Sequence, residues 1–323
     1  MAKQLGLAQN ASESCLACAR AETVGELLAL RILQSLATGT AFAVSRAMLS
    51  DLFSGDRLAR SLSLTMMIMT VAPLIAPGIG GEILSYLGWR WIFLALSAIG
   101  AVTTILCWLL LNETLSAADR LPFRPMAIIT RYGTILSNRH GLGLACIAGL
   151  LSAAYFANLA SVSFIIIDYH NGSSRLFAAF FASAGVMAIF ANFVNAKLVV
   201  SIGYRRMLFT GLVLAMINAA ALLYVTLTDA GGVWGVIACV VWLMGLFQTI
   251  SSNAMAGFLS LFRDRAGAAS AVFGSIRFSF GIAGSAAVGA LYTGHPSALG
   301  VVAFVSISSA AIVAILCLKT EGS

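Results

Sequence analysis

The sequence has few charged residues. Only 10% of its 323 residues are Asp, Glu, Lys or Arg, whereas soluble domains carry about 25%. Apolar residues make up 60% of the chain, and its mean hydropathy is +0.96. A water-soluble fold could not bury so much apolar surface. A soluble globular protein is therefore excluded, and we expect the surrounding medium to be lipid.

Acidic and histidine side chains are absent from the middle of the long apolar runs. All twelve Asp and Glu, and the three His, lie in connectors, at the ends of runs or in the N-terminal stretch. Proton relays in membranes usually depend on buried carboxylates or histidines, so the chain offers no evident central proton-binding residue. The runs also lack a His/Asp cluster or a Ser/Lys pair. We therefore expect neither an enzyme nor a bound cofactor.

Cysteine and the basic residues exclude two further classes of protein. Of the six Cys, only Cys15 and Cys18 form a CxxC pair, and a metal site of this type needs a second pair. We therefore expect no metal site. The net charge is +7, but most Lys and Arg fall between the apolar runs and they form no basic face, which argues against a nucleic-acid partner.

Long apolar runs occur about nine times, and each is close to the 20 residues that a helix needs to cross a bilayer. In lipid, the backbone must satisfy its own hydrogen bonds, whereas the strands of a membrane barrel would be short and alternating. We therefore predict an all-α polytopic membrane bundle of about nine transmembrane helices. The runs are approximately 24–45, 61–82, 91–111, 141–167, 176–196, 207–228, 232–257, 267–292 and 297–318.

The basic residues predict the orientation. About thirteen of them lie in alternate connectors and the C-terminal tail, and about two lie in the remaining connectors. By the positive-inside rule, the first group faces the cytoplasm. We therefore expect a multi-pass protein of the plasma membrane (the inner membrane of a bacterium) with a cytoplasmic C-terminus.

The longest connector predicts the domain organisation. Residues 112–140 are basic and separate about three runs from about six. We divide the chain into an N-terminal remnant (1–21), a three-helix part (22–111), the cytoplasmic linker (112–140) and a six-helix half (141–323).

The stretch TVAPLIAPGIGGEILSYLGWR (70–90) places helix breakers in an apolar run. Lipid-embedded helices tolerate Pro and Gly because neighbouring groups satisfy the freed backbone, and small residues let helices approach closely. Two interpretations stay open: a gate at which two helices rock, or a static packing kink. The residues concerned are Pro73, Pro77, Gly78, Gly80 and Gly81.

Several segments together resemble one protein family. APLIAPGIGG is similar to the antiporter motif in the fifth helix of drug/proton antiporters of the major facilitator superfamily. ALRILQSLATGTA (29–41) resembles the fourth-helix motif, with Arg31 and Gln34 in place and Ser35 where a Gly is usual. The sequences SRAMLSDLFSGDRLARSLS, GWRWIF and AASAVFGSIRFSFG resemble the bicyclomycin-resistance (Bcr/CflA) branch, and SIGYRRM resembles the second copy of the loop motif.

The resemblance implies a fold and a function. The nine runs would correspond to helices four to twelve of a twelve-helix fold, so we expect an N-terminally truncated member. The implied function is export of small amphipathic drugs or metabolites by proton antiport, although the acid expected in the first helix has no counterpart here. The alternative is a membrane fragment or scaffold that does not transport.

Two arginines lie inside apolar runs, where a charge usually faces a cavity or a partner. Arg31 is near the end of its run and could reach the interface, and the fourth-helix motif favours a functional role. Arg277 is near the middle of its run, and we expect it to face a cavity or to pair between helices.

Polar residues in two other runs are candidates for substrate contacts. Tyr155 and Asn158 lie in the run 141–167, and Gln248 and Asn253 in the run 232–257. Apolar pockets with a few polar groups suit amphipathic ligands. The competing interpretation is that these side chains form hydrogen bonds between helices.

Overall fold

The computed structural model describes residues 12–52, 61, 65, 75–76, 78–110, 132–262 and 265–318. The described residues are helical or lie in turns, without a strand, so the predicted all-α class is confirmed. The chain divides into two compact units, Met1–Phe123 and Arg124–Ser323.

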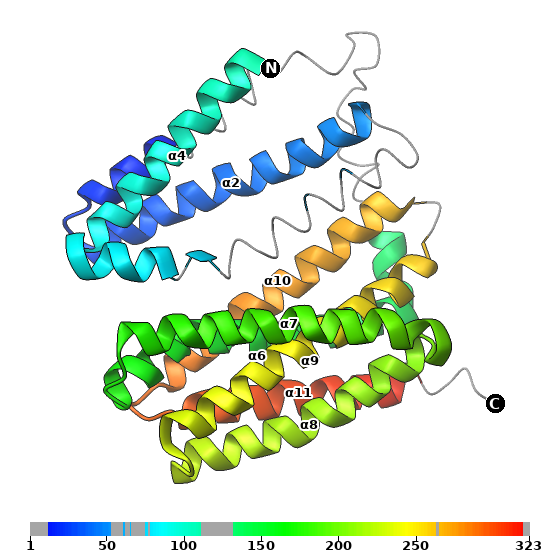
Figure 1. The fold of residues 1–323 in the computed structure, drawn as a ribbon. Helices are drawn as coiled ribbons and strands as arrows, with labels where there is room; N and C mark the ends of the chain where they lie inside the picture. Colours follow the sequence, from blue (N-terminus) through cyan, green and yellow to red (C-terminus); the bar gives the residue numbers. More distant parts are fainter. Residues whose placement is uncertain are drawn as a thin grey trace. The chain divides into compact units, whose positions relative to one another are not determined.

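Among the described residues of the first unit there are two long helices, α2 (Val24–Leu52) and α4 (Trp89–Leu110) (Figure 1). Residues 12–20 and 78–87 are also helical. Ser12 ties the N-terminal helical segment to α4, because its hydroxyl donates to the carbonyl oxygen of Ser97 at 2.9 Å.

In the part of the second unit that the structure describes, there are six long helices and one π-helical segment (Figure 1). The π-helical segment η2 continues directly from α6, and the remaining helices follow it along the chain. Their bounds are α6 Arg139–Ser163, η2 Phe164–Tyr169, α7 Ser174–Ile202, α8 Tyr204–Thr228, α9 Gly232–Ser260, α10 Ala266–Leu291 and α11 Ser297–Leu318.

Seven helices in the described part of the chain are long and apolar enough to cross a membrane. They are α4, α6 with η2, and α7 to α11, and they coincide within a few residues with the last seven predicted runs. The first predicted run lies within α2, a helix of 29 residues. Most of the second run, 61–82, lies outside the described residues.

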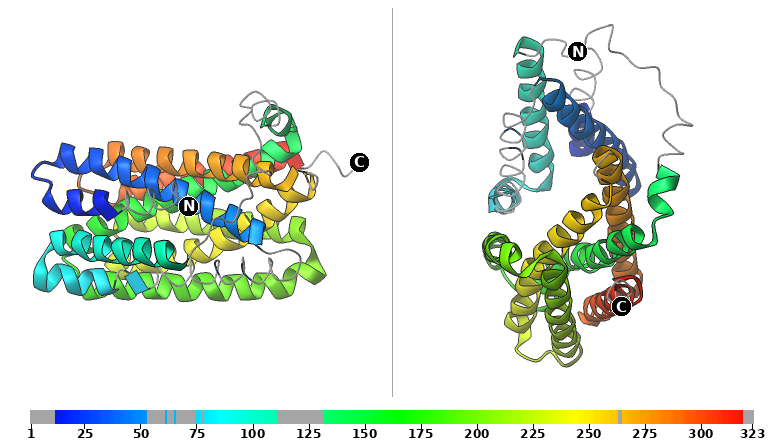
Figure 2. Two further views of the ribbon diagram at one scale, coloured as in Figure 1. Left: turned by 90° about the horizontal axis from the view of Figure 1, so that it is seen from above. Right: turned by 90° about the vertical axis from the view of Figure 1, so that its right-hand side faces the viewer.

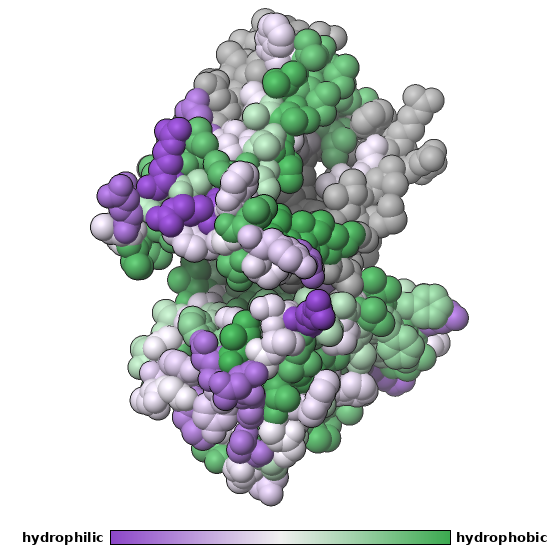
Figure 3. Space-filling model, turned by 60° about the vertical axis from the view of Figure 1, so that its left-hand side comes forward, coloured by the Kyte–Doolittle hydropathy of each residue, from purple (hydrophilic) through white to green (hydrophobic). Residues whose placement is uncertain are grey.

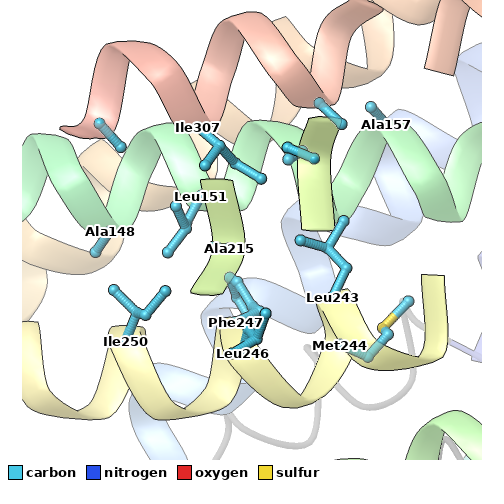
Figure 4. Close-up of a cluster of buried hydrophobic side chains, with 14 of the residues drawn as sticks. Ala148, Leu151, Ala157, Ala215, Leu243, Met244, Leu246, Phe247, Ile250 and Ile307 are labelled. Carbon is cyan, nitrogen blue, oxygen red and sulfur yellow. The ribbon is translucent and has the colours of Figure 1, made fainter. Parts of the chain in front are cut away.

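Helix α6 lies at the centre of the second unit. It packs against α9, α10 and α11, while α8 packs against α9 and α11, and α7 packs against α9. In the left view of Figure 2, the helices coloured from green to red lie lengthwise along one direction. Side chains from four helices meet in one apolar cluster (Figure 4), including Leu151 on α6, Ala215 on α8, Ile250 on α9 and Ile307 on α11.

The outer face of α7 shows what surrounds this unit. Only 11% of the most apolar 18-residue stretch of α7 is buried, compared with 56% of the corresponding stretch of α6 with η2. Val186, Ile189, Phe190 and Phe193 are all exposed, and their spacing places them on one face of the helix. Apolar side chains also cover much of the face seen in Figure 3. Such a surface is stable in lipid, not in water.

Three connectors meet at one end of the second unit. His170 Nε2 lies 3.6 Å from Asp229 Oδ1, which links the α6–α7 and α8–α9 connectors. The Tyr169 ring packs edge-on against His295 at 5.4 Å between centroids, which adds the α10–α11 connector. The alternation of connectors in the predicted topology requires these three to share one side of the membrane.

Glycines bring α6 and α10 into close contact. A Cβ atom on Gly281 would lie 2.6 Å from the Phe156 ring, and one on Gly284 would strike the backbone of Ala153. Small residues allow this approach, and the packing that results is a main force between helices in lipid.

We predict that Gly284→Ala destabilises the second unit by about 1–3 kcal/mol, because the methyl group forces the α6 backbone away. Gly289→Ala is the matched control, since a Cβ at that position of α10 meets nothing within 4 Å. Thermal unfolding of the two purified variants in detergent checks this. Equal stabilities for the two variants would contradict the packing described here.

Candidate functional site

Arg277 lies half-buried near the middle of α10 in the second unit. It is eleven residues from the start of α10 and fourteen from its end, which places it about 16 Å and about 21 Å from the two ends at a rise of 1.5 Å per residue. Its side chain cannot reach either interface. An arginine at this depth costs about 2.5–3.5 kcal/mol on insertion scales, so its contacts must offset that cost.

Two contacts hold the Arg277 guanidinium. Its Nε donates a hydrogen bond to Ser152 Oγ on α6 at 3.2 Å. Its Cζ lies 4.9 Å from the centroid of the Phe247 ring on α9. A hydrogen bond to a charged group contributes about 1.5–3 kcal/mol, and a cation–π contact contributes about 0.5–2 kcal/mol. Together these are comparable with the cost of burial, and they join three helices at one point.

Tyr155 belongs to the same cluster. Its ring stacks on Phe247 with 4.2 Å between centroids and an interplanar angle of 20°. It also packs edge-on against Phe156 at 5.4 Å, and Phe156 in turn lies 6.0 Å from Phe278 on α10. We call Arg277, Ser152, Tyr155, Phe156, Phe247 and Phe278 the arginine–aromatic cluster. Of the predicted site residues, the structure brings Tyr155 and Arg277 together in it.

Asn158 lies one helical turn beyond Tyr155 on α6. The residue is fully buried, and neither Oδ1 nor Nδ2 has a hydrogen-bond partner among the described residues. A buried amide without partners costs about 1–3 kcal/mol, so native structures rarely contain one. A water molecule or a polar group of a ligand would satisfy it.

Asn253 is engaged in a different way. Its Nδ2 donates to Asn195 Oδ1 on α7 at 2.6 Å and to the carbonyl oxygen of Thr249 at 2.8 Å. Asn195 Nδ2 donates in turn to Ser252 Oγ at 3.3 Å. These bonds join α7 to α9, as the competing interpretation of this residue expected. Gln248 is half-buried next to Phe247 and has no hydrogen bond to the described residues.

Arg31 and Gln34 form a separate cluster in the first unit. Arg31 Nη1 donates to Gln34 Oε1 at 2.8 Å, and Gln34 Nε2 lies 2.8 Å from Cys15 Sγ. The Arg31 guanidinium is also 5.5 Å from the centroid of the Phe93 ring on α4. The two residues that carry the resemblance to the fourth-helix motif are therefore in direct contact.

Gly78, Gly80 and Gly81 lie in a helical segment and have open space around them. A Cβ atom on Gly78, Gly80 or Gly81 would meet nothing within 4 Å. This face is free within the described part of the first unit, and the predicted packing against another helix stays a prediction. Pro73 and Pro77 lie outside the described residues.

Sequence reasoning missed Ser152, Phe247, Asn195 and Cys15 as members of these clusters. Ser152 and Tyr155 are three residues apart on α6 and so share a face, which is a signal that could have been used. Phe247 and Asn195 come from other helices. Their contacts depend on helix packing that a single sequence does not specify.

Comparisons with known proteins give a consistent result. The family model of the Major Facilitator Superfamily matches residues 11–285. A bicyclomycin resistance protein homolog of Haemophilus influenzae is 31% identical over 259 residues, which cover 80% of this chain and 65% of that protein. The uncharacterized MFS-type transporter YdgK of Bacillus subtilis is 30% identical over 85% of this chain and 69% of its own.

Two further matches extend this picture. Multidrug resistance protein MdtL of Klebsiella pneumoniae is 28% identical over 80% of this chain and 64% of its own. The crystal structure of a bacterial homolog of the human lysosomal transporter Spinster, inward-facing and occupied, has a TM-score of 0.71 at 15% identity. It covers 98% of this chain and 82% of its own. The chain thus spans about two thirds of the length of the curated relatives it matches.

We predict that the Asn195–Asn253 pair contributes a coupling energy of about 0.6 kcal/mol, and at most about 1.7 kcal/mol, to the stability of the second unit. A double-mutant cycle with Asn195→Ala and Asn253→Ala measures it from unfolding in detergent. A cycle that pairs Asn195→Ala with Ser309→Ala is the control, because Ser309 is half-buried and its hydroxyl bonds only within α11. If the paired asparagine variants are strictly additive, the 2.6 Å contact does not stabilise the protein.

Proposed function

Because this chain belongs to the major facilitator superfamily, we propose that it is a transporter that exports small amphipathic drugs or metabolites from the cell in exchange for protons. The names of its relatives, a bicyclomycin resistance protein homolog and a multidrug resistance protein, support this proposal. The relatives are named as transporters and resistance proteins, in agreement with the expectation that the chain is not an enzyme. The resemblance noted in the sequence is thereby confirmed at the level of the family.

Transport of this kind requires a change of conformation, not covalent chemistry. In the proposed mechanism, two bundles rock around a site near the bilayer midplane. The residues Pro73, Pro77, Gly78, Gly80 and Gly81 then form the contact at which helices slide. The open space at Gly78, Gly80 and Gly81, where a Cβ atom would meet nothing within 4 Å among the described residues, supports this role.

The arginine–aromatic cluster is the proposed substrate site of the second unit. It combines a cation, a hydroxyl group and several rings at the middle of a span, which is the kind of surface that an amphipathic molecule requires. Asn158 and Gln248 are further candidate contacts, because neither has a hydrogen bond to the described residues. Asn253 would act by fixing α9 against α7.

We propose proton coupling from the resemblance of the sequence to drug/proton antiporters. In the described spans, the acids lie at the ends: Asp168 is exposed in η2, and Asp229 follows α8. The proposed topology places the basic connectors and the C-terminus in the cytoplasm. The direction of export is proposed from the names of the relatives, which are resistance proteins. If export continued in the absence of a proton gradient, the proposed substrate site would stand and the proposed exchange for protons would be wrong.

We predict that Arg31→Ala abolishes export without removing the protein from the membrane, because it breaks the contact with Gln34. The measurement is the accumulation of amphipathic drugs, bicyclomycin among them, in a host that lacks its own pumps, with and without an uncoupler. Arg20→Ala is the control, since Arg20 is an exposed arginine of the same unit.

Wild-type export by the Arg31→Ala variant would contradict the role given to Arg31. If the unaltered chain inserts in the membrane and exports none of the compounds, the alternative of a non-transporting membrane scaffold is favoured instead.

A further inference from the structure

We propose that the arginine–aromatic cluster binds an anionic group, such as a carboxylate, that is attached to an aromatic ring, so that the preferred substrates are aromatic acids and not cationic drugs. This inference rests on the proposed function and specifies its substrate class. It is carried by the juxtaposition of Arg277 with Ser152, Tyr155 and Phe247 within one unit.

The charge around the site has one sign. Every other charged residue described in the second unit lies in a connector or within about two helical turns of a helix end; Lys197 on α7 is the farthest in, five residues from Ile202. Arg277 has no ion pair with any described carboxylate; its contacts are the hydrogen bond to Ser152 and the ring of Phe247. The midplane of this unit therefore carries a net positive charge. An unpaired charge in an apolar medium attracts a counter-charge strongly.

The hydrogen bonds of the guanidinium leave most of its donors unused. Ser152 Oγ donates to the carbonyl oxygen of Ala148 at 2.8 Å, so a lone pair of this oxygen is directed at Arg277 Nε. Nε donates one of the five N–H groups of the side chain. The other four, on the two terminal nitrogens, have no acceptor among the described residues. Arg277 is only half-buried, so these nitrogens remain accessible to a ligand.

The arrangement matches a carboxylate in geometry as well as in charge. The Ser152 bond and the Phe247 ring fix the plane of the guanidinium, and its terminal nitrogens form the planar fork that binds two carboxylate oxygens at once. The Tyr155 hydroxyl has no hydrogen bond to the described residues. Because the Tyr155 ring stacks on the same Phe247 ring that the Arg277 guanidinium contacts, its hydroxyl is a further candidate donor for the same anion.

The rings define the rest of the ligand. Tyr155 and Phe247 are stacked, and Phe156 and Phe278 form an edge-on pair beside them. Phe278 is 57% exposed, so an aromatic ligand can pack against it. A cationic ligand would gain the same ring contacts but would be repelled by Arg277.

A purely structural role for Arg277 explains less. Tying α10 to α6 uses only Nε, and a neutral donor would do this at a lower cost of burial. A purely structural role does not account for the four remaining N–H groups or the Tyr155 hydroxyl, which have no hydrogen-bond partner among the described residues. The two roles predict different binding behaviour, and the following experiment separates them.

The test uses the purified full chain in lipid nanodiscs, with binding of radiolabelled 2-naphthoate measured by scintillation proximity. Unlabelled 2-naphthoate, 2-naphthamide and 2-naphthylmethylamine compete for the site, since they share one ring system and differ in charge. We expect saturable binding of the acid, at least tenfold weaker competition by the amide, and weaker competition still by the amine.

The variants identify the residue responsible. Arg277→Gln should weaken 2-naphthoate binding at least tenfold, Arg277→Lys less than that, and Ser152→Ala about threefold, because the last change releases the guanidinium without removing its charge. Arg206→Gln is the matched control at an exposed position near the start of α8 and should bind as the unaltered chain does. Monodisperse elution of each variant shows that it is folded, and partial binding by Arg277→Lys shows that charge is what matters.

Three results would overturn the proposal: no saturable binding of 2-naphthoate to the folded chain, equal affinity in Arg277→Gln, or preference for the amine. A separate measurement of transport in everted vesicles distinguishes failure of this binding proposal from failure of the proposed function. Binding of the acid that depends on Arg277, without export of any compound, would end the proposed function and leave the site in place. Export of drugs with no binding of the acid would support the proposed function and contradict the proposed binding of aromatic acids.

Discussion

The structure depends on the requirement that every backbone polar group in lipid finds its partner within the protein. A helix meets this requirement alone, and seven described helices are long and apolar enough to span the bilayer. Since lipid tails are as apolar as the helix surfaces, burial does not drive the helices together. Close packing does, as at Gly284 against Ala153, and α6 is central because its small residues admit three neighbours.

The same medium makes each polar side chain in a span significant. Asn195 and Asn253 satisfy each other, and the hydroxyl groups of Ser152, Ser161 and Thr226 donate to carbonyl oxygens of their own helices. Arg277 and Asn158 are different, because hydrogen-bonding groups of both remain without partners among the described residues. Asn158 lies on α6, and Arg277 lies on α10, which packs against α6. Asn218 Oδ1 on α8 and His170 Nε2 in the α6–α7 connector also lack a hydrogen bond among the described residues. In the proposed function, a transported molecule supplies partners for Arg277 and Asn158.

The sequence predicted the helices far better than the sites. Apolar length alone located α4 and α6 to α11 within a few residues, because lipid forces such runs to be helical. It also singled out Arg277, since a charge in mid-span is rare. It could not show that Phe247 and Ser152 hold that arginine, or that Asn253 pairs with Asn195, because these contacts depend on how helices rotate and cross. The π-helical turn of η2 was also unforeseen, because its residues, FIIIDY, look like an ordinary continuation of the span.

The central claim is that lipid surrounds this chain and that its basic connectors share one face of the membrane. The most direct measurement is labelling of single cysteines at the two ends of α8, Arg206→Cys and Thr228→Cys, in a background without the native cysteines. A charged maleimide is applied to right-side-out and to everted vesicles. The account predicts labelling of position 206 in everted vesicles only and of position 228 in right-side-out vesicles only. Labelling of both positions from the same side would contradict it.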